Sequence, residues 1–325
     1  MTVLVTGGAG YIGAHVVKLI RDAGGDALVV DDFSTGLAAR VPGATIVRMD
    51  LSVPDSVERL SVVLREHDVR SVIHLAAKKR VDESMALPAF YFRQNISGLA
   101  NVLLAMQATN VDRLVFSSSA AVYGSPATYE VTEDAPLSPE NPYGQTKLVG
   151  EWLVRDAVRA WGLRAVSLRY FNVAGAGSPE LGDPLVMNLV TMLLQGRSLG
   201  QQPKVFGGDY PTRDGSCVRD FVHVRDVARA HLASLDYLSR PQRPWDVFNV
   251  GTGTGSTVLE VTRELAAVSG WNVEPEICPR RPGDPASVVA SVDRIAETMA
   301  WRAENALPDI LSSAWTAWQH DHPNA

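Results

Sequence analysis

The chain has 325 residues, 46% of them hydrophobic and 20% charged, so it can bury one large core or two moderate ones. Its formal net charge of −6 provides no general basic surface for nucleic acid, and an anionic ligand must be held by a few local cations. Two cysteines without metal-type spacing, no apolar run of bilayer length and no basic leader before the first apolar segment predict a cytoplasmic protein that binds neither metal nor membrane.

The first 32 residues follow the order of a dinucleotide-binding βαβ unit. An apolar strand (2–6) leads into a glycine-rich turn (7–13), and after a helical pattern a second strand (27–30) ends in Asp31 and Asp32. Glycines let the backbone approach a pyrophosphate, whose charge then faces amides at a helix N-terminus. A carboxylate at Asp31 accepts hydrogen bonds from the adenosine ribose and repels a 2′-phosphate, so we expect NAD rather than NADP. The triplet alone also fits an ordinary tight turn.

Strands and helices keep alternating as far as residue 168. Strand patterns occur at 45–49, 71–75, 113–116 and 165–168, and helix patterns at 55–66, 95–108 and from Pro142. Repeated βα units predict a doubly wound parallel sheet of the Rossmann type, covered on both faces. The serine run 117–119 follows a strand, at the sheet edge where ligands bind in open α/β sheets.

Beyond Tyr170 the pattern loosens, which predicts a smaller α/β lobe. We expect helices at 185–194 and 225–237, from a capping box at Thr257 and Glu260 to Gly270, and after Asp293 and Pro308, with strands at 247–250 and 273–277. The predicted domains are residues 1–172 with 220–253, for the cofactor, and residues 173–219 with 254–325.

A tyrosine and a lysine one helical turn apart carry the candidate chemistry. Asn141 and Pro142 predict a helix start, which places Tyr143 and Lys147 on one helix face. A tyrosine has an ordinary pKa of about 10, and the charge of Lys147 and the first turn of the helix favour its phenolate. We expect Tyr143 to exchange a proton with a substrate hydroxyl that Ser119 holds. The spacing alone also fits an amphipathic pair on a surface helix.

Over nearly its whole length the chain resembles the extended short-chain dehydrogenases, and within them the UDP-hexose 4-epimerases. The resemblance rests on residues 6–13 (TGGAGYIG), 74–77, 117–124, 142–147 (PYGQTK), 169–175, 218–224 and 280–284. It implies interconversion of UDP-galactose and UDP-glucose with no net redox change. Tyr143 would take the proton of the sugar 4-hydroxyl as hydride passes from C4 to tightly held NAD, and the 4-keto sugar would turn before hydride returns to its other face. Lys147 would lower the tyrosine pKa, and Ser119 would bridge to the 4-oxygen.

The same resemblance implies two sets of binding residues. The cofactor set is Gly7, Gly10, Tyr11, Ile12, Gly13, Asp31, Asp32, Asp50, Leu51, Lys79, Asn95, Ser117, Tyr143, Lys147 and Tyr170. The set for the UDP sugar, which assigns the smaller lobe to that substrate, is Lys79, Ser119, Tyr143, Asn172, Arg219, Arg281, Asp284 and Val288. Arginines suit a pyrophosphate because it needs charge-assisted donors. For Arg219, an ion pair with the neighbouring Asp220 is the alternative.

Positions that differ among related families bear on the substrate. Ala120 and Ala121 stand where related dehydratases carry an Asp–Glu pair, and the Glu of related decarboxylases is also missing, which favours epimerisation. Many members have Thr in place of Ala121, and residues 185–188 lack the family's polar-Leu-aliphatic-Pro pattern. Val288 replaces the tyrosine of restrictive members, so UDP-N-acetylhexosamines are also candidate substrates.

Three alternatives stay open at this point. The chain is compatible with a 4-epimerase or 4-ketoreductase of another nucleotide sugar, and with a non-catalytic NAD-binding regulator, which would tolerate loss of Tyr143 or Lys147.

Family members are often homodimers through helices that match 95–108 and 142–159, so we expect a homodimer, although these helices also suit packing within one chain.

Overall fold

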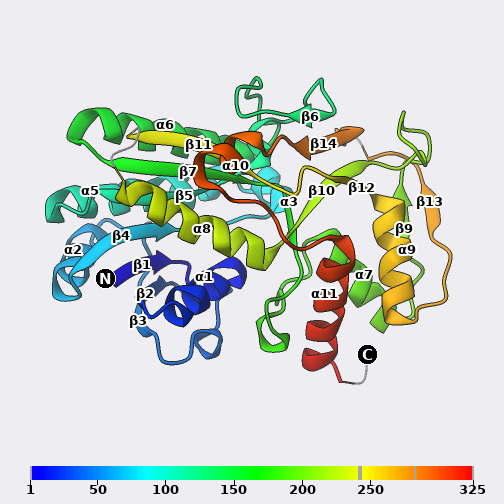
Figure 1. Ribbon diagram of the computed structural model, residues 1–325, viewed down its shortest axis with the longest axis horizontal. Helices are drawn as coiled ribbons and strands as arrows, with labels where there is room; N and C mark the ends of the chain where they lie inside the picture. The colour runs from blue at the N-terminus through cyan, green and yellow to red at the C-terminus, as the bar shows by residue number, and fades with distance from the viewer. Residues whose placement is uncertain (1, 241–243, 282, 324–325) are drawn as a thin grey trace. The chain divides into compact units, whose positions relative to one another are not determined.

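The computed structural model describes residues 2–240, 244–281 and 283–323 (Figure 1). The chain forms two compact units: the first is Met1–Gly124, Leu137–Arg169 and Ala228–Phe248, and the second is Ser125–Pro136, Tyr170–Val227 and Asn249–Ala325. Residues 125–136, 170–172, 220–227 and 249–253 were predicted for the first domain but belong to the second unit. In the loop 125–136, β6 (Glu130–Val131) pairs with β14 (Ser287–Ala290). The assignment of a ligand to each domain stays a prediction.

A seven-stranded sheet in the order β11-β7-β5-β4-β1-β2-β3 organises the first unit. Its strands are β1 (Thr2–Thr6), β2 (Asp26–Asp31), β3 (Thr45–Arg48), β4 (Val69–His74), β5 (Arg113–Ser119), β7 (Arg164–Tyr170) and β11 (Trp245–Val250). Every neighbouring pair from β3 to β5 is parallel. The strand order reverses between β1 and β4, and in such sheets ligands bind at this switch point. The glycine-rich turn follows β1, so the sheet places it there.

Helices cover this sheet and connect its strands. They are α1 (Tyr11–Asp22), α2 (Ser56–Glu66), α3 (Val81–Ala86), α4 (Pro88–Phe92), α5 (Gly98–Thr109), α6 (Pro142–Trp161) and α8 (Val224–Ser239). The predicted helix 95–108 is in fact a π-helical turn, Arg93–Ser97, continued by α5. With these helices, the predicted doubly wound α/β fold is confirmed.

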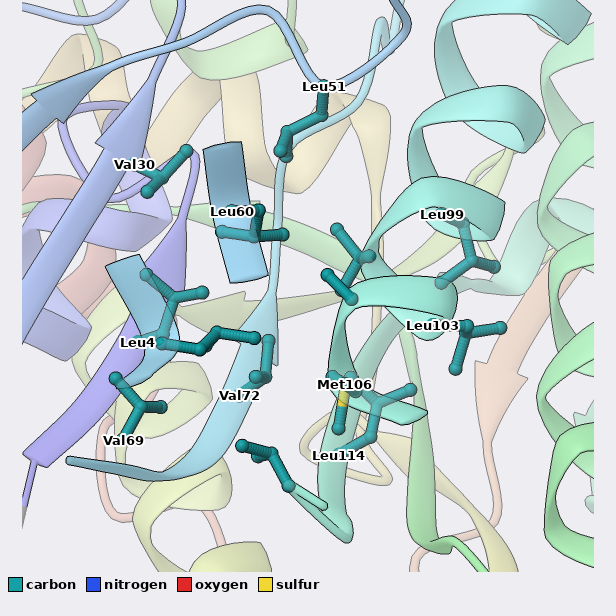
Figure 2. Packing of buried hydrophobic residues seen from close by; sticks show 14 of the residues in the cluster. Leu4, Val30, Leu51, Leu60, Val69, Val72, Leu99, Leu103, Met106 and Leu114 are labelled. Atoms are coloured by element: carbon teal, nitrogen blue, oxygen red, sulfur yellow. The ribbon is translucent and has the colours of Figure 1, made fainter. Parts of the chain in front are cut away.

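The core of the first unit joins helices α2 and α5 to the central strands. Figure 2 shows the side chains that meet there, among them Leu4, Leu60, Val72, Leu99, Leu103, Met106 and Leu114. Leu4 of β1 lies in register between Leu28 of β2 and Val72 of β4. Strands buried on both faces in this way need apolar side chains at nearly every position.

The second unit is a smaller α/β lobe with its own core. Its main sheet has the order β12-β10-β14-β6, with β8 paired to β10, and β13 pairs with β9. The strands are β8 (Asn172–Ala174), β9 (Lys204–Phe206), β10 (Val218–His223), β12 (Gly255–Thr257) and β13 (Glu276–Cys278), and the helices are α7 (Leu189–Ser198), α9 (Val258–Ser269), α10 (Asp293–Met299) and α11 (Leu307–Asp321). Apolar residues of α7, α9, α11 and β10 form one buried cluster.

Capping decides where two of these helices begin. The capping box of Thr257 and Glu260 opens α9, and Gly270 closes it in the left-handed conformation, both as predicted. The predicted helix 185–194 is wrong at its start, because the Asn188 side chain accepts the Thr191 amide and makes Leu189 the first helical residue.

Within the described ranges, no helix is both long and apolar enough to cross a membrane. The same residues contain no group of three His, Cys, Asp or Glu side chains placed to hold a metal ion.

The α2 contact with the sheet can be tested by truncating one side chain. Leu60 is fully buried, so Leu60→Ala should lower the free energy of unfolding by about 2–5 kcal/mol. Val62 lies on the same helix but is 44% exposed, and Val62→Ala should change it by no more than about 0.5 kcal/mol. Urea denaturation of both variants measures the difference. Equal effects would contradict the packing described for α2.

Candidate functional site

Glycines make the turn after β1 tight. Gly7 adopts a left-handed conformation with φ +69°, and a Cβ on Gly13 would lie 2.2 Å from the Gly7 carbonyl oxygen. Helix α1 begins at Tyr11, and its N-cap, Gly10, contributes no side-chain hydrogen bond. An anion is the ligand that the N-terminus of such a helix favours.

Asp31 ends β2 beside this turn. Its carboxylate is buried and accepts hydrogen bonds from the amides of Ala9, at 3.0 Å, and Phe33, at 2.9 Å. Burial raises the pKa of Asp31, and these two hydrogen bonds oppose the shift. The acid is thus fixed against the glycine-rich turn, where the sequence predicts contact with a ribose.

Asp32 forms a cluster with a lysine that sequence reasoning missed. Its carboxylate accepts hydrogen bonds from the amide and hydroxyl of Ser34, at 2.8 and 2.7 Å, and pairs with Lys78 Nζ at 3.3 Å. Burial alone would raise the pKa of Asp32, but these hydrogen bonds and the lysine charge outweigh it and lower the pKa. The predicted Lys79 is exposed instead, with Nζ 5.8 Å from the centre of the Tyr11 ring. Two adjacent lysines give no sequence signal for which of them turns towards β2.

Three further residues predicted to contact the cofactor are Asp50, Leu51 and Asn95. Asp50 accepts hydrogen bonds from the amide and hydroxyl of Ser52. Leu51 belongs to the buried core. Asn95 accepts the Lys78 amide at 2.8 Å, and its side-chain amide donates to the Lys78 carbonyl and to Thr146 Oγ1, each at 3.0 Å. Asn95 therefore links the loop after β4 to helix α6.

The predicted start of helix α6 is confirmed. The Asn141 side chain accepts the Gly144 amide at 2.9 Å, and Pro142 is the first helical residue. A Cβ on Gly144 would lie 2.7 Å from the Ala121 carbonyl oxygen, so only glycine allows this approach. It holds the first turn of α6 against the segment that follows the serine run.

The structure brings Ser117, Ser119, Tyr143 and Lys147 together. Lys147 Nζ donates to the Ser117 carbonyl at 2.7 Å and lies 5.9 Å from the centre of the Tyr143 ring. The Tyr143 hydroxyl forms a hydrogen bond with Ser119, whose Oγ also accepts the Ala121 amide at 3.2 Å. The residues predicted for proton transfer thus lie at the carboxyl end of β5.

Burial dominates the electrostatics of this group. It lowers the pKa of Lys147 to about 8, although the charge of Glu151 opposes the shift. It raises the pKa of Tyr143, and the hydrogen bond with Ser119 only partly offsets this. The predicted lowering of the tyrosine pKa is therefore wrong for this structure. The low dielectric around the phenol destabilises the phenolate more than the hydrogen bond with Ser119 stabilises it.

In the second unit, Arg219 lies among three acceptors. It donates through Nη1 to the carbonyls of Val218 and Pro285, each at 2.8 Å, and its Nη2 is 3.6 Å from Asp284 Oδ1. The alternative pairing with Asp220 is wrong, because that carboxylate is fully buried and accepts amides from the loop after β11 and from β14. Two predicted substrate residues, Arg219 and Asp284, therefore lie together.

The remaining predicted residues of the second unit lie on strands and loops. Tyr170 ends β7 and is buried, Asn172 is exposed on β8, and Val288 of β14 stands opposite Arg219 of β10. The guanidinium of Arg281 lies 3.8 Å from the centre of the Phe206 ring, a partner that the sequence did not suggest. Pro282, in the same motif as Arg281, is outside the described residues.

A glycine-rich turn at the switch point and a Ser–Tyr–Lys group at the carboxyl end of β5 define an NAD-binding protein of the short-chain dehydrogenase type. The chain belongs to the NAD dependent epimerase/dehydratase family, whose model matches residues 3–251.

Individual relatives match the chain over nearly its full length. A UDP-glucose 4-epimerase of Azospirillum brasilense is 43% identical over 323 residues, covering 98% of this chain and 91% of the relative. A UDP-glucose 4-epimerase of Stenotrophomonas maltophila, solved with bound NAD and formylated UDP-arabinopyranose, is 38% identical with a TM-score of 0.94 and covers 100% of both chains. That of Bifidobacterium longum, solved with NAD+ and UDP, is 34% identical with a TM-score of 0.89, covering 100% of this chain and 99% of that one.

His74 at the end of β4 should make stability sensitive to acid. Its ring bonds to Thr6 at 2.8 Å, and burial together with the Lys147 charge lowers its pKa to about 3. Between that value and the ordinary pKa of about 6.5, only the unfolded chain binds the proton, so the free energy of unfolding should fall by about 1.4 kcal/mol for each unit of pH lost.

Urea denaturation between about pH 5 and pH 7 measures this slope. His74→Asn should flatten it, whereas His320→Asn, at an exposed position, should leave it unchanged. A slope that is the same in His74→Asn and in the unmodified protein would contradict a neutral buried imidazole.

Proposed function

We propose that this protein interconverts UDP-galactose and UDP-glucose by epimerisation at C4. The observation that carries the proposal is the group of Ser119, Tyr143 and Lys147 at the end of β5, in the same unit as the glycine-rich turn and Asp31. Gly7 and Gly13 allow the tight turn that leads into helix α1, whose N-terminus suits the pyrophosphate of a dinucleotide, and Asp31 suits its ribose. The glycine-rich turn and Asp31 would hold NAD, which would supply hydride chemistry at C4.

The residues of the first unit have separate tasks in this reaction. Tyr143 takes the proton of the 4-hydroxyl and later returns it, and Ser119 holds the 4-oxygen through a hydrogen bond. Lys147 contributes its positive charge, which favours the phenolate of Tyr143 when the proton is on its way to or from the sugar. Because burial raises the pKa of Tyr143, the charge of Lys147 has to offset that shift when the proton is transferred.

The residues of the second unit suit the UDP part of the substrate. Arg219 and Arg281 supply donors to a pyrophosphate, and Asn172 and Asp284 offer polar contacts to the nucleoside. A relative solved with NAD+ and UDP supports a substrate that contains UDP. Val288 leaves more room than a tyrosine would, so we extend the substrate class to UDP-N-acetylhexosamines.

A homodimer in the cytoplasm is the proposed state of the enzyme. Leu104 of α5 is 51% exposed and Trp152 of α6 is 47% exposed, and these two helices contact each other within the first unit. Large apolar side chains on neighbouring helices suit a second copy of the same surface. Cys217 and Cys278 are both free thiols, which suits a reducing compartment.

The proposed reaction predicts turnover without added cofactor. The purified protein should convert UDP-galactose to UDP-glucose, resolved by chromatography, because a tightly held cofactor is regenerated in each cycle. Tyr143→Phe should retain the cofactor while turnover falls about 10²–10⁴-fold. Tyr129→Phe, at an exposed tyrosine of the second unit, serves as the control and should retain turnover.

Other outcomes would point to the alternatives. Unchanged turnover in Tyr143→Phe would refute the role of the tyrosine. Stoichiometric consumption of reduced cofactor would indicate a 4-ketoreductase. If UDP-galactose is left unchanged even with NAD supplied, another nucleotide sugar or a regulatory role becomes the better account.

The size of residue 288 should set tolerance for an N-acetyl group. Val288→Tyr should lower kcat/KM for UDP-N-acetylgalactosamine by about 10-fold or more, because an added ring competes with the acetyl group for space. The value for UDP-galactose in the same variant is the internal control and should change little. An equal fall for both sugars would mean that the tyrosine disturbs the fold rather than the acetyl site.

A further inference from the structure

Tyr143, Lys147 and Glu151 follow one another at four-residue intervals on α6. This spacing places side chains above one another on a single face of a helix. Lys147 is 5% exposed and Glu151 is 2% exposed, so the lower part of the stripe is buried. Glu151 has no part in the reaction described above.

Glu151 is the centre of a buried hydrogen-bond network. Its Oε1 accepts from Ser118 Oγ at 2.5 Å and from Arg169 Nε at 2.9 Å, and its Oε2 accepts from Arg169 Nη2 at 2.7 Å. Arg169 Nη1 also donates to the Tyr123 hydroxyl at 2.9 Å. One carboxylate therefore joins β5, α6 and β7 immediately next to the proposed site.

The network holds the serine run through the same face of α6 that carries Tyr143 and Lys147. Ser118 is the residue between Ser117, whose carbonyl accepts from Lys147 Nζ, and Ser119, which bonds to Tyr143. Glu151 and Lys147 thus hold adjacent residues of β5 from the same stripe of α6. A displaced Glu151 would shift both the acceptor of Lys147 and the hydroxyl of Ser119.

Few charges face the ammonium of Lys147. Tyr143 and Glu151 approach it from α6, His74 from β4 and the ring of Phe116 from β5, while Arg169 of β7 lies behind Glu151. The imidazole of His74 is neutral, because its pKa is lowered to about 3 by burial and by Lys147 itself. The Ser117 carbonyl accepts a hydrogen bond from the ammonium, and the Glu151 carboxylate is the charge that favours the charged form of Lys147.

We propose that Glu151 is a positioning residue for the reaction, holding the serine run against α6 and keeping Lys147 cationic beside Tyr143. The inference rests on the proposed epimerase function. A buried ion pair is weak evidence for stability, because apolar residues of similar volume often replace one without loss.

Titration of Lys147 tests the charge directly and without substrate. The chain has five lysines, Lys18, Lys78, Lys79, Lys147 and Lys204, so NMR of protein labelled at lysine ¹³Cε gives few signals. Lys147→Met identifies the one that belongs to Lys147. Its pKa should be about 8 in the unmodified protein. It should fall by about one unit in Glu151→Gln, since a nearby opposite charge is lost, and stay near the unmodified value in Glu151→Asp.

Asp112→Asn is the matched control. Asp112 accepts hydrogen bonds from Arg164 at the amino end of β7, as Glu151 does from Arg169 at its carboxyl end. Its loss should leave the titration of Lys147 unchanged. Should Glu151→Gln fail to fold, the double variant Glu151→Gln/Arg169→Gln leaves no unpaired guanidinium and should show the same lowered pKa.

Turnover gives the second readout. The fall of kcat at high pH, which follows loss of the Lys147 proton, should move to lower pH in Glu151→Gln by the amount measured by NMR, with KM little changed. An unmodified protein that leaves UDP-galactose untouched would refute the proposed function, while the titration would still decide the role of Glu151. An unchanged Lys147 pKa in folded Glu151→Gln would overturn the inference.

Discussion

The close approach of helix α6 to strand β5 is the constraint on which the site depends. Two glycines allow it: a Cβ on Gly144 would lie 2.7 Å from the Ala121 carbonyl oxygen, and one on Gly150 would lie 2.6 Å from Phe116. Any larger side chain at these positions would push the helix away from the strand. Tyr143 and Lys147 are carried by the same helix, so their distances to Ser119 and Ser117 depend on this close packing of α6 on β5 and on the turn that follows it.

The close packing of α6 also explains why the pKa of Tyr143 is raised and the pKa of Lys147 is lowered. A helix packed tightly on a strand excludes water, and exclusion of water penalises both a phenolate and an ammonium. A lysine beside a tyrosine lowers the pKa of the tyrosine only if the lysine stays charged. Burial works against that at Lys147, so the site requires a further anion, and Glu151 with its partner Arg169 is buried beside it.

Local sequence signals predicted the features that depend on a few neighbouring residues. Caps at Asn141 and Thr257, the glycine-rich turn and the alternation of strands and helices each follow from contacts within about one helical turn or one strand. Features that depend on contacts across the fold were missed or wrong: the orientation of Lys78, the stacking of Arg281 on Phe206 and the raised pKa of Tyr143. Burial and long-range pairing arise only when distant segments pack, so the motif located the site but not its electrostatics.

An acidic chain that binds an anionic ligand must keep some of its cations incompletely neutralised. Arg219 shows how the second unit does this: its short hydrogen bonds go to two neutral carbonyls, whereas the nearest carboxylate oxygen, on Asp284, is 3.6 Å away. Arg281 lies against the face of Phe206, which orients a guanidinium without cancelling its charge. Carbonyls and a ring fix these side chains in place without neutralising them, so a net charge of −6 is compatible with the proposed binding of a nucleotide sugar.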